Sequence, residues 1–251
     1  MAEKFNGLNY NFIEGSGTPL VFLHGWLDLM DSWKPVIDCL ELENPVLLYD
    51  QRCHGRSECS EFTFEGLAED LESLLDHLGI ENAVLIGHSM GGMVALQFAV
   101  QNPERVSKLF LAASCASTPE PEGKSPKYFL ENLGSMDRER WAEEIMENYT
   151  GGGELDERRE KSKKVLVNAD RTPVECGLRE MVEFDIRLEV EERLSGKDAM
   201  VVAGKDDGAI TLDKCRELSD LLDCPLKVLD STHLMLQERS EELGEFLEKF
   251  L

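Results

Sequence analysis

Short apolar runs alternate with amphipathic stretches along most of the chain. Six runs have the length and composition of buried strands: Leu20–Leu23, Val46–Tyr49, Val84–Ile86, Leu109–Ala112, Met200–Ala203 and Leu226–Leu229. Helical spacing of apolar positions predicts helices between and after them: Ser32–Leu40, Phe64–Leu78, Met90–Gln101, Leu212–Leu222 and Ser240–Leu251. Alternating strands and helices predict an α/β fold with a mostly parallel, doubly wound sheet, whose ligands bind beyond the carboxyl ends of the strands.

This alternation stops between Ser114 and Ser195, where the chain is helical and highly charged. We therefore divide it into a core domain, residues 1–113 and 196–251, and an inserted helical segment, residues 114–195. Within the insertion, Trp141, Ile145 and Tyr149 stand at i, i+4 and i+8 and predict one apolar helix stripe. The stripe either packs the insertion onto the core, which we favour, or contributes to a substrate pocket.

A candidate nucleophile stands between a predicted strand and a predicted helix, in the sequence Gly87-His88-Ser89-Met90-Gly91. A G-x-S-x-G sequence in that setting is the nucleophile-elbow pattern, in which a sharp turn exposes the serine hydroxyl. Gly87 and Gly91 leave room for the turn because they have no Cβ. The following helix directs its positive end at the serine, where negative charge would develop.

A serine nucleophile requires a base, and the chain has five histidines. His233 is the only one that follows the serine, in a loop after the run Leu226–Leu229. The other four lie upstream, inside the turn or at the end of a helix: His24, His54, His77 and His88. A structural loop histidine is the alternative interpretation, but with the elbow present we predict that His233 is the base.

A third group should orient the imidazole and stabilise its positive charge. The run Met200–Ala203 ends at Gly204-Lys205-Asp206-Asp207, between the serine and the histidine in the chain. Two adjacent carboxylates are available there, and their spacing alone does not choose between Asp206 and Asp207. An acidic surface turn is the alternative in a chain this rich in carboxylates.

Together these motifs resemble the α/β-hydrolase superfamily, close to its short esterase, lactonase and cofactor-free haloperoxidase-like branches. The similar segments extend over nearly the whole chain: Leu20–Trp26, Trp33, Tyr49–Ser57, Gly87–Gly91, Gly204–Asp207 and His233. The chain departs from many relatives at Cys53, where they have glycine, and at Leu27, where haloperoxidase-like members often have proline.

The resemblance implies an α/β-hydrolase fold with a helical cap, residues 114–195, inserted after the sixth strand. It selects Asp207 as the acid, three residues after Gly204. It also implies an oxyanion hole formed by the backbone N–H groups of Trp26 and Met90. Tentative side chains for an acyl or aryl pocket are Trp26, Tyr128, Phe129, Met136, Trp141 and Met146.

These residues predict a serine hydrolase that cleaves small to medium carboxylic esters through an acyl-enzyme, with a triad of Ser89, Asp207 and His233. The alternatives are a lactonase or acyltransferase with the same triad, and a slow or non-catalytic ligand receptor on a hydrolase fold. The expected partner is a small-molecule ester. The chemistry needs neither a metal nor another cofactor.

Charge and composition narrow the function further. The chain has 50 acidic and 26 basic residues, a net charge of −24, which opposes binding to nucleic acid because phosphate contacts need clustered Lys and Arg. We expect no membrane span, because no run of about 18 apolar residues occurs, and no signal peptide at the N-terminus. Seven scattered cysteines without a C-x-x-C pair favour reduced thiols and a cytoplasmic location, with Cys53 and Cys59 unpaired.

Overall fold

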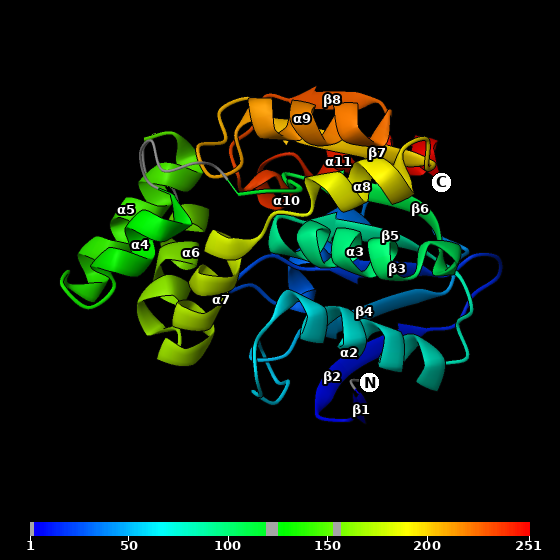
Figure 1. Ribbon diagram of the computed structural model, residues 1–251, viewed down its shortest axis with the longest axis horizontal. Helices are drawn as coiled ribbons and strands as arrows, with labels where there is room; N and C mark the ends of the chain where they lie inside the picture. Colours follow the sequence, from blue (N-terminus) through cyan, green and yellow to red (C-terminus); the bar gives the residue numbers. More distant parts are fainter. Residues whose placement is uncertain (1–2, 119–124, 153–156) are drawn as a thin grey trace.

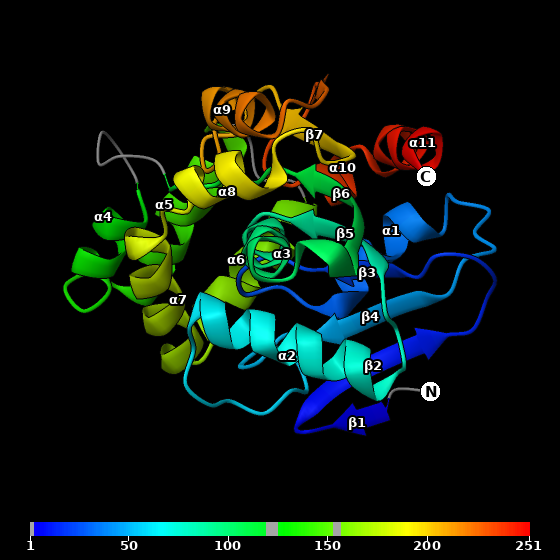
Figure 2. The same cartoon turned by 45° about the vertical axis from the view of Figure 1, so that its right-hand side comes forward.

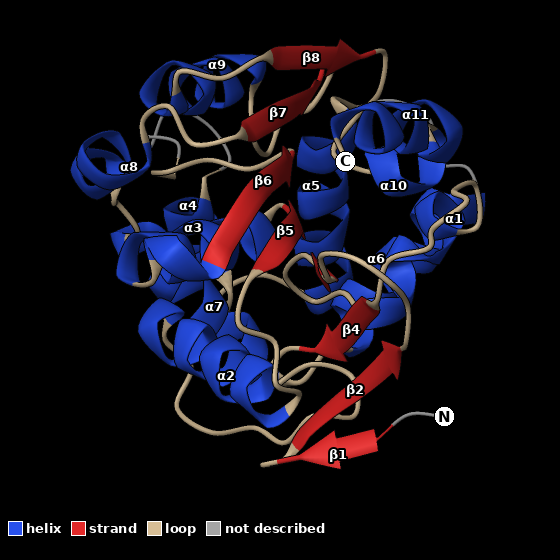
Figure 3. Cartoon of the chain, turned by 90° about the vertical axis from the view of Figure 1, so that its right-hand side faces the viewer, coloured by secondary structure: helices blue, strands red, loops and turns tan. Residues whose placement is uncertain are grey.

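The computed structural model describes residues 3–118, 125–152 and 157–251. Its strands form one sheet in the order β1-β2-β4-β3-β5-β6-β7-β8, with β2 antiparallel to both neighbours and the strands from β4 to β8 parallel (Figure 3). The strands are β1 (Glu3–Phe5), β2 (Leu8–Ile13), β3 (Leu20–Leu23), β4 (Val46–Asp50), β5 (Ala83–His88), β6 (Val106–Ala112), β7 (Ala199–Gly204) and β8 (Leu226–Leu229). The predicted α/β fold is confirmed.

Helices cover both faces of this sheet (Figure 2). On one face lie α2 (Phe64–His77), α3 (Met90–Gln101), α8 (Arg187–Leu194) and α9 (Leu212–Leu222). On the other lie α1 (Lys34–Ile37), α10 (Met235–Glu238) and α11 (Ser240–Phe250). Two 3₁₀ turns, Met30–Trp33 and Pro103–Arg105, complete this part of the chain. Within the described residues, no helix combines the length and the apolar composition needed to cross a bilayer.

The strands supply side chains to both covering layers by alternation. In β3, Val21 and Leu23 join the cluster beneath α2 and α3, whereas Leu20 and Phe22 join the cluster beneath α1 and α11. All four side chains are fully buried. Successive side chains of a strand point to opposite faces, so a parallel sheet covered on both faces needs apolar residues at every position. This requirement explains why the central strands are continuous apolar runs.

Two elements at the N-terminal side differ from expectation. Strands β1 and β2 were not among the expected elements, although Leu8, Tyr10 and Phe12 alternate with Asn9 and Asn11 in the period-2 pattern of a strand. The turn Asn6–Gly7 joins them with both residues at positive φ, and Asn-Gly is a recognised hairpin signal. The helix expected over 32–40 is a 3₁₀ turn followed by the four-residue α1, with Pro35 in its first turn, where proline is tolerated.

The insertion between β6 and β7 forms a separate group of helices beside the sheet, at the left of Figure 1. It contains α4 (Pro126–Asn132), α5 (Arg138–Thr150), α6 (Glu157–Asn168) and α7 (Arg171–Glu183), whereas α8 packs against α3 and α9 of the core. Trp141 is fully buried, and its indole N–H donates to the carbonyl oxygen of Phe129 at 3.1 Å. This position agrees with the packing interpretation of that residue.

Side chains from the core fasten the insertion in place. The indole N–H of Trp26 donates to the carbonyl oxygen of Pro173 at 3.0 Å, and an ion pair joins Arg159 of α6 to Glu238 of α10 at 3.3 Å. Both members of this pair are largely covered, with side-chain exposures of 15% and 18%. The basic segment of α6 therefore contributes to docking as well as to the solvated surface.

Cys53 and Cys59 form a disulfide, so the expectation of reduced thiols at these two positions is wrong. The backbone N–H of Cys53 donates to the carbonyl oxygen of Glu58 at 3.1 Å, which closes the loop and brings the two thiols together. Cys53 has a φ of 64°, in the left-handed region that favours glycine. The structure also contains free cysteines at Cys39, Cys115, Cys176, Cys215 and Cys224.

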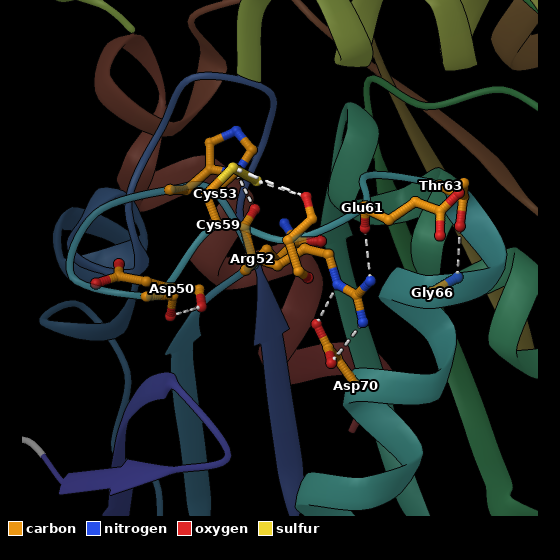
Figure 4. A network of polar contacts seen from close by, with 12 residues as sticks. Asp50, Arg52, Cys53, Cys59, Glu61, Thr63, Gly66 and Asp70 are labelled. Atoms are coloured by element: carbon orange, nitrogen blue, oxygen red, sulfur yellow. Dashed lines mark hydrogen bonds and ion pairs between the residues drawn. A yellow bond between two sulfur atoms is a disulfide. The ribbon is translucent and has the colours of Figure 1, made fainter. Parts of the chain in front are cut away.

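Polar contacts fix the remainder of the same loop to α2 (Figure 4). The guanidinium of Arg52 donates to both carboxylate oxygens of Asp70, at 2.6 and 2.7 Å, and to the carbonyl oxygen of Glu61 at 2.7 Å. Thr63 caps the helix by accepting the N–H of Gly66 at 3.0 Å. The loop is thus held at both ends, by the disulfide and by a bidentate ion pair.

The disulfide is expected to stabilise the protein. Closing a loop this short reduces the entropy of the unfolded chain by an amount equivalent to about 2 kcal/mol. The double variant Cys53→Ser/Cys59→Ser should therefore melt roughly 5 °C lower than the wild type in a calorimetric scan. Cys39→Ser, which removes an exposed free thiol, is the matched control and should leave the melting temperature unchanged. Equal melting temperatures for all three proteins would contradict the expected contribution.

Candidate active site

Ser89 occupies the sharp turn between β5 and α3, with φ 53° and ψ −122°. Its own N–H donates to the carbonyl oxygen of Ala112 at 2.9 Å, and the Ser114 hydroxyl donates to its carbonyl oxygen at 3.0 Å. A Cβ at Gly87 would lie 2.5 Å from the Cα of Gly92. These contacts hold a non-glycine residue in a conformation that costs of order 1–3 kcal/mol elsewhere.

The structure brings Ser89, His233 and Asp207 into one hydrogen-bonded chain. His233 Nε2 lies 3.0 Å from Ser89 Oγ, and His233 Nδ1 lies 2.8 Å from Asp207 Oδ2. The other oxygen of Asp207 accepts the N–H groups of Ala209 and Ile210 at 2.8 and 2.9 Å. Because Oδ1 is held by the backbone, Oδ2 remains directed at the imidazole. Asp206 is exposed and outside this chain.

Contacts from both the core and the insertion position His233. Its backbone N–H donates to the carbonyl oxygen of Tyr149 in α5 at 2.9 Å, and the Tyr149 ring lies 4.6 Å from the imidazole. Its carbonyl oxygen accepts the Nε2–H of His88 at 3.0 Å. Glu238, which forms the ion pair with Arg159 of α6, also accepts the N–H of Thr232 at 2.8 Å. Motion of the insertion would therefore be transmitted directly to the imidazole.

The proposed oxyanion donors, Trp26 and Met90, are both near Ser89: Trp26 lines the same cavities, and Met90 is the next residue in the chain. Met90 begins α3, where the first N–H groups of a helix have no partner within it. Within the described residues, neither N–H group has a hydrogen-bond acceptor. Two free N–H donors on adjoining loops are the arrangement that an oxyanion hole requires.

Two buried histidines fix the loop that carries Trp26. His24 Nε2 accepts the N–H of Gln51 at 3.0 Å, and His54 Nε2 accepts the N–H of Leu27 at 3.0 Å. Burial lowers the pKa of His24 to about 3, and burial also lowers the pKa of His54. Both rings are therefore neutral near pH 7, which leaves Nε2 free to accept. The disulfide stands next to His54 and so stabilises this part of the site.

Two cavities meet at Ser89 and His233, and Trp26 and Tyr149 line both. The first, about 80 Å³, is lined by Gly25, Trp26, Leu27, Asp28, His88, Ser89, Tyr149, Ser162, Val165, Leu166, His233, Leu234 and Gln237. The second, about 50 Å³, is lined by Trp26, Ser89, Met93, Thr118, Pro126, Phe129, Ile145, Asn148, Tyr149, Leu178, Met181, Ala209, Ile210 and His233. We name them the Asp28 cavity and the Phe129 cavity.

Of the tentative pocket residues, Trp26 and Phe129 line these cavities. The other four do not line either cavity as the described residues define them, and they contact other parts of the insertion: Tyr128, Met136, Trp141 and Met146. The Tyr128 hydroxyl, for example, donates to Glu144 at 2.7 Å. Side chains that the sequence did not nominate, Met93, Leu178 and Ile210, complete the apolar wall.

Several functional positions had a weak signal in the sequence or none. Tyr149 was visible as the end of the Trp141 stripe, but only the fold turns its ring toward His233. Asp28 and Glu238 are two of many carboxylates, and nothing local separates them from surface residues. Within the described chain, no group of three or more His, Cys, Asp or Glu side chains could hold a metal ion.

The family model described as alpha/beta hydrolase fold matches residues 18–239. The chain belongs to this family, as the resemblance implied. A soluble epoxide hydrolase from Corynebacterium sp. (strain C12) is 38% identical over 109 residues, which is 42% of this chain and 38% of that protein. The matched part thus spans about two fifths of that relative's length. The 3-oxoadipate enol-lactonase 1 of Acinetobacter baylyi is 25% identical over 87% of this chain and 83% of its own length.

A solved structure, the enol-lactonase from Burkholderia xenovorans LB400, superposes with a TM-score of 0.85. The alignment covers 100% of this chain and 99% of that one, at 23% sequence identity. This likeness confirms the fold over the full length of the chain.

Neutral burial of His24 predicts a pH-dependent stability. Its pKa is about 3 in the folded protein and 6.5 in the unfolded chain, so between these values the unfolded state binds the extra proton. Stability should therefore fall as the pH decreases from 6.5. In His24→Gln, the plot of unfolding free energy against pH should be flatter by up to about 1.4 kcal/mol per pH unit between pH 4.5 and 6. Urea titrations at a series of pH values measure this slope. Equal slopes for the wild type and His24→Gln would contradict the burial of His24 as a neutral ring.

Proposed function

We propose that this protein is a serine hydrolase that cleaves carboxylic esters of small to medium size through an acyl-enzyme. The observation that carries the proposal is the hydrogen-bonded chain from Ser89 through His233 to Asp207. A serine hydroxyl alone is a weak nucleophile, and an adjacent base held by a third group activates it. A serine at the elbow also favours acyl transfer over epoxide opening, for which relatives of this fold use aspartate.

The reaction follows from the geometry. Ser89 Oγ attacks the ester carbonyl while its proton moves to His233 Nε2, and Asp207 keeps the other ring nitrogen protonated. The N–H groups of Trp26 and Met90 would stabilise the oxyanion, each by about 3 kcal/mol of barrier. His233 then protonates the leaving alcohol. Water, activated by the same imidazole, hydrolyses the acyl-enzyme and regenerates Ser89.

The lining of the cavities supports a substrate with an apolar part. The Phe129 cavity is lined mainly by apolar side chains, as sites for small molecules generally are. Residues 114–195 would act as the cap, since Tyr149, Leu178 and Met181 of the insertion line the cavity next to Ser89. We further propose a cytoplasmic location, which the free thiols of Cys39, Cys115, Cys176, Cys215 and Cys224 support.

Lactone hydrolysis is the second candidate for the same triad. A lactone is an internal ester, so ring opening uses the same attack and leaves the alcohol attached to the acyl group. The relationship to the Acinetobacter enol-lactonase extends over most of both chains and supports this candidate. Opening of a lactone ring and cleavage of a linear ester can be compared directly in one assay series.

The two neighbouring aspartates provide a matched test of the triad. Asp207→Asn should lower kcat for p-nitrophenyl butyrate by about 10³- to 10⁴-fold, because the amide no longer fixes the productive imidazole tautomer. Asp206→Asn removes the same charge one residue away from an exposed side chain and should change kcat by less than about threefold. Initial rates at pH 8 give the kcat values of both variants. Equal effects, or a larger loss at Asp206, would contradict the assignment of the acid.

A further inference from the structure

Asp28 places a carboxylate in the cavity next to Ser89, two residues beyond the proposed oxyanion donor Trp26. Its Oδ1 accepts the N–H of Leu29 at 2.9 Å. Within the described residues it forms no ion pair with a lysine or arginine, and its side chain is only partly exposed. A partly buried charge without a counter-ion is costly, and a ligand cation would offset that cost.

His88, in the nucleophile turn, lines the same cavity. His88 donates through Nε2 to the carbonyl oxygen of His233, so its Nδ1 carries a lone pair. Burial lowers the pKa of His88 to about 3, and the ring is therefore neutral. His88 is 6% exposed, and its Nδ1 has no partner among the described residues. The ring therefore adds no positive charge to the wall of the cavity that contains the carboxylate.

Aromatic rings contribute a third feature that favours a cation. Trp26 and Tyr149 both line the Asp28 cavity, and the faces of such rings attract ammonium groups, most strongly when water is excluded. Burial raises the pKa of the Asp28 carboxyl to about 6, so the group is ionised at pH 8. The net charge of −24 would also draw cationic molecules toward the protein.

The Phe129 cavity, which shares Ser89 and His233 with the Asp28 cavity, has a different character. Its described lining contains no lysine, arginine, aspartate or glutamate, and Met93, Ile145 and Leu178 form much of its wall. A molecule whose ester bond lies at Ser89 would thus extend one end into an apolar space. Its other end would meet a carboxylate, a neutral imidazole and two aromatic rings.

We propose that Asp28 is a specificity-determining residue and that the substrates are esters with one apolar end and one ammonium-bearing end, the ammonium lying in the Asp28 cavity. The inference rests on the proposed ester hydrolysis and adds the substrate class. Asp28 takes no proton from the reacting atoms; it binds and positions the charged end of the substrate.

Matched ester pairs test this inference. In the first pair, choline butyrate is compared with 3,3-dimethylbutyl butyrate, which has the same shape without the charge. In the second pair, the cation is on the acyl side: hexyl 4-(trimethylammonio)butyrate is compared with hexyl 5,5-dimethylhexanoate. The wild type should prefer the cationic member of one pair by about tenfold or more in kcat/KM at pH 8 and low salt. The pair that shows the preference identifies which end of the ester occupies the Asp28 cavity.

Asp28→Asn should reduce this preference to about one, because the cationic ester loses the carboxylate that binds its ammonium group. Asp31→Asn removes the same charge from an exposed side chain that pairs with Lys34, and it should keep the preference. About 0.5 M salt should weaken the preference in the wild type. Two results would overturn this inference and leave the proposed ester hydrolysis intact. One is hydrolysis of the neutral esters without a cationic preference in either pair, and the other is a preference that survives in Asp28→Asn. Absence of turnover for every ester would instead contradict the proposed function.

Discussion

The backbone of Ser89 is the constraint on which the rest of the site depends. The chain passes from β5 into α3 within one residue at φ 53°, and this is sterically possible only because Gly87 and Gly91 have no side chains. A Cβ at Gly91 would lie 2.3 Å from the carbonyl oxygen of Leu23 in the neighbouring strand. The turn thus requires tight packing of strand and helix, and it places Ser89 directly before the N-terminus of α3.

The position of the imidazole depends on both parts of the molecule. Asp207 and His88 belong to the core, whereas the carbonyl oxygen that accepts the N–H of His233 belongs to Tyr149 in the insertion. Glu238 joins the loop before His233 to Arg159 of α6. The insertion therefore encloses the cavities and also helps to fix the proposed base. Preorganisation of this kind lowers the reorganisation needed when charge develops during a reaction.

Much of the core could be predicted from the sequence, because a sheet covered on both faces demands continuous apolar strands. The nucleophile turn was equally visible, since its geometry requires small residues at fixed spacing. The choice between Asp206 and Asp207 needed the family resemblance, because it depends on the N–H groups of Ala209 and Ile210 that turn one carboxylate inward. The pairing of Cys53 with Cys59 depends on the turn of a single loop, which the hydrogen bond from Cys53 to Glu58 closes. The position of Asp28 depends on how distant loops meet, and no local pattern encodes that.

The central claim is that Ser89 carries the acyl group during turnover. Mixing the protein with p-nitrophenyl butyrate, quenching with acid during the first turnover and measuring the intact mass tests it most directly. The account predicts a mass increase of one butyryl group, located by peptide mapping on the segment that contains Ser89 and absent in Ser89→Ala. Rapid ester turnover by Ser89→Ala, or a butyryl group on a different side chain of a competent enzyme, would contradict the account.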